Sequence, residues 1–196
     1  MSSCFYRKII DGQGIILSDG DIVLRQQFFN ILIDVLRIMI EFGTDNIEAG
    51  NMAPFLLSFE EGQDNAIRLI VALASKGEKE ADINDMGIPE LGKLLKNSYP
   101  LYPSKEKIYE LIFEQYLIHQ TRNESLCCWD DYEISHGNFF IVFERSRLLD
   151  YMDTLIEKGL ADAYWPDGWK HYGICCQNHI IDIISPHAPT IKPFGE

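Results

Sequence analysis

One run of apolar residues without polar alternation, residues 139–143, organises the last third of the chain. Its members are all aromatic or β-branched, and Gly137 and Asn138 precede it. A run of this kind predicts a central strand that is covered on both faces. Such a strand needs a packed layer on each side.

An amphipathic helix is predicted next, over residues 147–158. Ser146 is a suitable N-cap, and Lys158 followed by Gly159 is a typical end of a helix. The apolar stripe that should face the strand consists of Leu148, Leu149, Met152, Leu155 and Ile156.

The pattern then changes to short strands. Residues 161–165 are predicted to be extended, residues 166–168 (Pro-Asp-Gly) to form a turn, and residues 169–176 and 179–184 to pair as a hairpin. With the strand and helix before them, these segments predict a β-α-β-β-β unit at the end of the chain.

Helical patterns predominate in the first part of the chain, after a small hairpin predicted within residues 5–17. The predicted helices run from Asp19 or Asp21 to Phe42 and over residues 54–59, 64–75, 89–96 and 104–120. The predicted fold is therefore α+β: a single domain over residues 1–196, in which a mainly helical subregion (1–122) packs on a small sheet in an α/β subregion (123–196).

The charge of the chain narrows the classes of partner. Seventeen basic and 30 acidic residues give a formal net charge of −13. This charge argues against unassisted binding to nucleic acid or to an anionic membrane, and it favours a basic protein partner. A chain of 196 residues can also bury its core without a metal or disulfide, so no cofactor is expected.

The cysteines indicate a reducing compartment. Five of them form an odd set that contains two adjacent pairs, which is a poor disulfide framework. They are Cys4, Cys127, Cys128, Cys175 and Cys176. No signal peptide is recognised, so a cytoplasmic protein is expected.

The most reactive residue types lie on the last predicted hairpin. If Gln177 and Asn178 form its loop, alternation places His171, Cys175 and Asp182 on one face of the sheet. These three residue types can form a thiol nucleophile site, as in a small cysteine-dependent hydrolase. The competing interpretation is structural, because an aspartate paired with a histidine is an ordinary way to satisfy a polar core.

Metal binding is disfavoured by the spacing of the possible ligands. Adjacent cysteines on a strand point to opposite faces, so each pair could offer one ligand at most, and no metal site is predicted. The chain also has no phosphate-binding glycine loop and no Gly-x-Ser-x-Gly motif.

A recognition surface is predicted where aromatic and acidic residues alternate in loops. Aromatic side chains supply buried area and acids supply steering toward a cation, although tryptophans also cap cores. The predicted partner-binding residues are Trp129, Asp130, Asp131, Glu133, Trp165, Asp167 and Trp169.

In its small size and acidic composition the chain resembles the cytoplasmic immunity partners of bacterial toxins. The resemblance includes no diagnostic motif and implies no site residue. It implies a non-catalytic protein-binding module that neutralises a basic partner such as a toxin domain. The alternative is the cysteine- or metal-dependent hydrolase that would use His171, Cys175 and Asp182.

Overall fold

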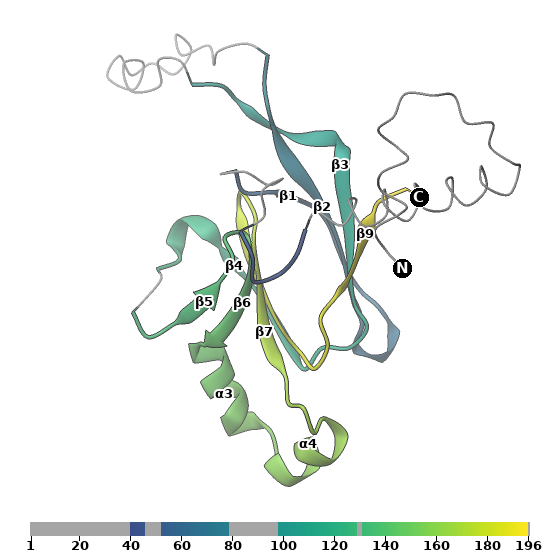
Figure 1. Ribbon diagram of the computed structural model, residues 1–196, viewed down its shortest axis with the longest axis vertical. Coiled ribbons are helices and arrows are strands. Elements are labelled where there is room, and N and C mark those ends of the chain that lie inside the picture. The colour runs from purple at the N-terminus through teal and green to yellow at the C-terminus, as the bar shows by residue number, and fades with distance from the viewer. Residues whose placement is uncertain (1–39, 46–51, 79–97, 129–130, 196) are drawn as a thin grey trace, which may run out of the picture. The chain divides into compact units, whose positions relative to one another are not determined.

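The computed structural model describes residues 40–45, 52–78, 98–128 and 131–195 (Figure 1). The chain divides into two compact units, Met1–Arg37 and Ile38–Glu196, and the described residues all belong to the second. The predicted hairpin within residues 5–17, the helix 89–96 and most of the long helix before them lie outside the described residues. Residues 40–42, where that long helix was predicted to end, are not helical.

Two antiparallel sheets make up most of the described structure (Figure 1). The four-stranded sheet has the order β1 (Phe55–Glu61), β2 (Ile67–Lys76), β3 (Leu101–Phe113) and β9 (Thr190–Pro193). The five-stranded sheet has the order β4 (Ile118–Asn123), β8 (His179–Ser185), β7 (Lys170–Cys175), β6 (Phe140–Arg145) and β5 (Ile134–His136). The other elements are two single-turn 3₁₀ helices, η1 (Gln63–Asn65) and η3 (Glu124–Leu126), and two α-helices, α3 (Arg147–Leu155) and α4 (Lys158–Tyr164).

The predicted α+β fold with a helical subregion over residues 1–122 is therefore wrong. The segments predicted as helices 54–59, 64–75 and 104–120 form β1, β2, and β3 with the start of β4. The run in β2 contains β-branched residues, which suit a strand. Its apolar residues are nearly continuous, so they fit the spacing of a helix face as well as that of a strand face. A second sheet that covers this run decides in favour of the strand.

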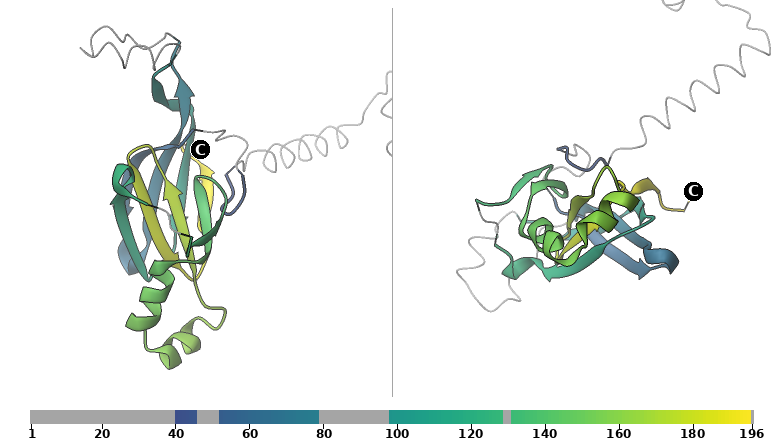
Figure 2. Two further views of the ribbon diagram at one scale, coloured as in Figure 1. Left: turned by 90° about the vertical axis from the view of Figure 1, so that its left-hand side faces the viewer. Right: turned by 90° about the horizontal axis from the view of Figure 1, so that it is seen from below.

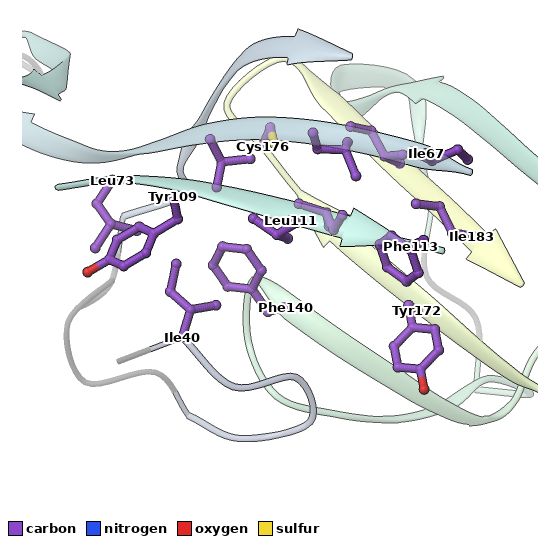
Figure 3. Packing of buried hydrophobic residues seen from close by; sticks show 14 residues of the cluster. Ile40, Ile67, Leu73, Tyr109, Leu111, Phe113, Phe140, Tyr172, Cys176 and Ile183 are labelled. Carbon is purple, nitrogen blue, oxygen red and sulfur yellow. The ribbon is translucent and has the colours of Figure 1, made fainter. Parts of the chain in front are cut away.

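The core lies between the two sheets, as Figure 3 shows. Leu111 and Phe113 project into it from β3, and Phe140 and Tyr172 from the five-stranded sheet. The rings of Phe113 and Tyr172 meet edge to face with centroids 5.5 Å apart, which joins the two sheets directly. The ring of Phe42 contacts the rings of Phe113, Phe140 and Tyr172 from the segment before β1.

Several predictions for the C-terminal third are confirmed. Residues 139–143 lead into and form most of β6, whose Phe140 and Ile141 are both buried although they point to opposite faces. The strand lies between β5 and β7, next to the edge of its sheet rather than at its centre. Ser146 caps α3, and its Oγ accepts a hydrogen bond of 3.1 Å from the Leu149 backbone N–H.

The segment predicted as extended, residues 161–165, is instead mostly helical and belongs to α4. The unit that begins with β6 is therefore β-α-α-β-β, because α4 follows α3 before β7 begins. Both helices lie beyond the same end of the sheets (Figure 2). Leu148 and Met152 attach α3 there, packing with Ile184 of β8 in a second apolar cluster.

The β9 strand forms one edge of the four-stranded sheet, where ion pairs as well as backbone hydrogen bonds hold it against β3. Lys192 Nζ lies 2.7 Å from Glu110 Oε2 on β3, and Arg68 on β2 binds the other carboxylate oxygen. Hydrogen bonds from Lys192 and Arg68 hold the pKa of the buried Glu110 carboxyl below its usual range. Pro193 ends this edge strand.

Within the part of the chain that the structure describes, no helix is long and apolar enough to span a membrane.

Two neighbouring substitutions test the strand assignment of β3. Leu111 is fully buried between the sheets, whereas Ile112 points to the outer face and is half-buried. Replacing Leu111 with alanine should reduce the free energy of unfolding by about 3 kcal/mol, and replacing Ile112 by about 1 kcal/mol. Urea denaturation of both variants provides the measurement. Equal losses would contradict the strand, because successive residues of a strand point to opposite faces of the sheet and only one of these two can face the core.

Candidate functional site

A buried carboxylate, Asp182 on β8, is the centre of a polar network that joins three strands and the start of α3. It is fully buried and is contacted from both neighbouring strands. From β4, Gln120 Nε2 donates to Oδ2 at 2.9 Å, and Arg122 donates to both oxygens at 2.7 and 3.0 Å. From β7, His171 Nε2 lies 3.1 Å from Oδ1. The carboxylate is thus held by four hydrogen bonds.

His171 extends this network to helix α3. Its Nδ1 lies 2.8 Å from Ser146 Oγ, the same oxygen that caps α3. In the neutral ring that donates from Nε2 to Asp182, Nδ1 accepts the hydroxyl proton of Ser146. The Phe143 ring stacks on the imidazole at a centroid distance of 4.0 Å, over the place where Gly173 has no side chain. The histidine is therefore fixed in position and buried.

The pKa of Asp182 lies below its usual range. Burial alone raises the pKa, but hydrogen bonds from His171, Arg122 and Gln120, together with the charge of Arg122, outweigh the cost of desolvation. Asp182 is accordingly an ionised carboxylate in the folded protein at neutral pH.

The register predicted for the last hairpin is confirmed. Gly173 pairs with Asp182 and Cys175 with Ile180, so His171, Cys175 and Asp182 share one face as the alternation required. Both ring nitrogens of His171 are occupied by Ser146 and Asp182, which leaves neither to take a proton from a thiol. Burial, reinforced by the charge of Asp182, raises the pKa of Cys175 to about 12. This shift is opposite to the one that a nucleophilic thiol needs.

The residues of the predicted recognition surface lie in different environments in the structure. Trp129 and Asp130 lie outside the described residues, while Asp131 and Asp167 are exposed. Glu133 Oε1 accepts a hydrogen bond of 3.3 Å from the Arg147 backbone N–H at the start of α3. Trp169 packs against the apolar cluster under α3. The glutamate and this tryptophan thus have structural contacts.

Trp165 is the member of that set that lines a groove. This α4 groove is a cavity of about 450 Å³ between α4, the end of α3 and the turn that joins β3 to β4. It is lined by Asn65, Gln115, Tyr116, Leu117, Ile156, Glu157, Leu160, Ala161, Tyr164 and Trp165.

Two side chains of α4 beside this groove are unusually exposed for their types. Leu160 is 57% and Tyr164 69% exposed, and their spacing of four places them on one face of the helix. Sequence reasoning placed Tyr164 with Trp165 at the predicted turn, but it missed Leu160 because Gly159 was interpreted as the end of a helix rather than as part of the first turn of the next. The available signal was Glu157 as an N-cap: its side chain accepts a hydrogen bond from the Leu160 backbone N–H.

Comparison with known proteins gave no match to a family model, a curated protein or a solved structure. Function is therefore inferred from the geometry. Four cysteines fall within the described residues, and all four are free thiols. Three of them (Cys127, Cys175 and Cys176) line a cavity of about 630 Å³, yet no group of three or more His, Cys, Asp or Glu side chains within the described ranges could hold a metal ion.

Replacing Asp182 with asparagine tests the buried network. The variant leaves Arg122 without its anion, and since that guanidinium is partly exposed we expect a loss of about 2–3 kcal/mol in the free energy of unfolding at pH 7. A carboxyl with a lowered folded pKa contributes stability above about pH 4 and loses it as the pH falls through the folded value. Urea titrations from neutral to acidic pH should thus show a shallower acid loss for Asp182→Asn than for wild type. The exposed Asp167→Asn variant is the control, and matching profiles for all three proteins would contradict the assignment.

Thiol labelling tests the reactivity of Cys175. Because burial raises its pKa to about 12 while Cys128 is exposed, iodoacetamide should modify Cys128 well before Cys175 at pH 8. Peptide mapping by mass spectrometry at increasing times gives the order. Labelling of Cys175 ahead of Cys128 would instead support the hydrolase alternative.

Proposed function

We propose that this chain is a non-catalytic binding protein of the cytoplasm, of the immunity or inhibitor type, which holds a basic protein partner such as a bacterial toxin domain. The observation that carries the proposal is the α4 groove, where Leu160 and Tyr164 are largely exposed and Glu157 is one of the lining residues. The acids nearest in sequence to its lining residues are Asp64, Glu114 and Asp162, all three exposed.

This combination suits protein recognition. Aromatic and aliphatic anchors supply affinity when a partner covers them, while surrounding charge mainly accelerates the encounter. The net charge of −13 extends the attraction for a basic partner over the whole chain. Exposed apolar side chains that are grouped beside a cavity also carry a cost in water that a bound partner would remove.

The hydrolase alternative lacks a functional base. His171 is buried under Phe143 and uses both ring nitrogens in the network around Asp182. Cys175, with its raised pKa, is a thiol rather than a thiolate at neutral pH. The hydrogen bonds that link Asp182 through His171 to Ser146 position α3, and this structural role accounts for both side chains.

Affinity capture with the full chain tests the proposed function. We expect a basic protein to be retained from an extract of the native cell at about 50 mM salt and released by about 500 mM, since salt screens the charges that steer association. With that partner purified, Glu114→Gln and Asp162→Asn together should lower the association rate constant several-fold and leave the dissociation rate nearly unchanged.

The matched control for this experiment is Glu106→Gln, which removes an exposed acid from β3 that is not next to any groove-lining residue in sequence. It should reduce the association rate much less than the double variant. Retention of no basic protein, or of a partner whose binding is insensitive to salt, would refute the proposed function.

A further inference from the structure

We infer that the α4 groove receives a segment of the partner in which an apolar side chain lies next to a lysine or arginine. The inference rests on the proposed function and specifies the chemistry of the segment that this site would bind. It follows from the apolar floor of the groove, its glutamate and its polar walls.

The floor of the groove is apolar and leaves room for a side chain. Ala161 is buried there and contributes only a methyl group. Leu117 and Ile156 belong to the cluster that attaches α3 to the sheet, so this part of the floor is anchored in packed structure. Leu160 and Tyr164 border the opening and are largely exposed. An aliphatic or aromatic side chain of a partner would bury these surfaces at little cost in rearrangement.

Negative charge lies within the groove. Glu157 is a lining residue, and its Oε2 accepts the 2.8 Å hydrogen bond that caps α4. Neither Glu157 nor the acids next to lining residues in sequence, Asp64, Glu114 and Asp162, make a salt bridge with another described side chain. The aromatic rings of Tyr116, Tyr164 and Trp165 line the same cavity. A carboxylate beside aromatic faces is a favourable setting for an ammonium or guanidinium group.

The remaining lining residues favour a peptide over other occupants. Asn65 and Gln115 carry side-chain amides, which can both donate to and accept from a peptide backbone. Glu157 in the groove and the net charge of −13 would repel nucleic acid phosphates, and they would equally repel a second copy of this acidic chain. The occupant that satisfies the apolar floor and the negative charge together is a basic, amphipathic segment of another protein.

Three synthetic peptides of about ten residues can test this preference against the full chain. The first combines leucine and lysine in an amphipathic order, the second replaces each leucine with serine, and the third replaces each lysine with glutamate. We expect the first to bind with a Kd below about 1 mM and the other two at least tenfold more weakly, because each lacks one half of the recognition chemistry. NMR shifts of the Leu160 and Ala161 methyl groups and of the Trp165 indole locate the site. Equal binding of the serine peptide, shifts confined to other elements, or no binding of the first peptide would overturn the inference.

Surface variants give a second, independent readout. Leu160→Ala and Tyr164→Ala alter exposed side chains and should preserve the fold while weakening the first peptide at least tenfold. The control is Tyr102→Ala on β3, because Tyr102 is 56% exposed and does not line the groove. It should leave peptide binding unchanged. Loss of binding in the control to the same extent would overturn the assignment of the site.

The captured partner separates this inference from the proposed function. If a basic partner binds the Tyr164→Ala variant as tightly as the wild type, the groove is not its docking site, and the inference fails while the proposed function stands. If no basic protein is captured, the proposed function fails, whereas groove-specific binding of the leucine-lysine peptide would still support the preference of the groove itself.

Discussion

The ionised carboxylate of Asp182 is the constraint that connects the interior of this structure to its surface. A buried charge is tolerated only when it is well paired and hydrogen-bonded, and Gln120, Arg122 and His171 provide those bonds from the strands on either side. His171 in turn bonds Ser146, the residue at which α3 begins. Since α4 follows α3 directly, the position of the groove depends on a charge that no partner would touch.

The residues that suggest catalysis and those that suggest binding are thus separated in the molecule. The residue types that suggest catalysis, a thiol, an imidazole and a carboxylate, lie on one face of β7 and β8. His171 and Asp182 are buried there and engaged with each other, and the half-buried Cys175 is protonated. The residue types that suggest binding are apolar and exposed, and they occur on a seven-residue helix beyond the end of the sheets. Exposed Leu160 and Tyr164 are informative because side chains of these kinds more often contribute to a core.

Features determined by neighbours in sequence could be predicted, and those determined by distant segments could not. A two-residue loop was enough to set the register of β7 and β8, and the Ser146 cap is a local signal. By contrast, Tyr109 of β3 pairs with Pro193, far along the chain, and without knowledge of that partner strand an apolar run fits a helix equally well. The groove was missed for a similar reason, since its walls come from η1, the β3–β4 turn and α4.

The β9 edge has a consequence for how copies of this chain behave at high concentration. Phe194 donates its backbone N–H inward to Ile108, so by alternation the nitrogen of Pro193 faces outward, where it has no proton to offer. A strand that tried to pair with this edge would lack a backbone hydrogen-bond donor at Pro193 and would meet the charged side chain of Lys192 one residue away. This border of the four-stranded sheet is therefore a poor template for fibril growth, even though the molecule exposes apolar side chains such as Leu160 elsewhere.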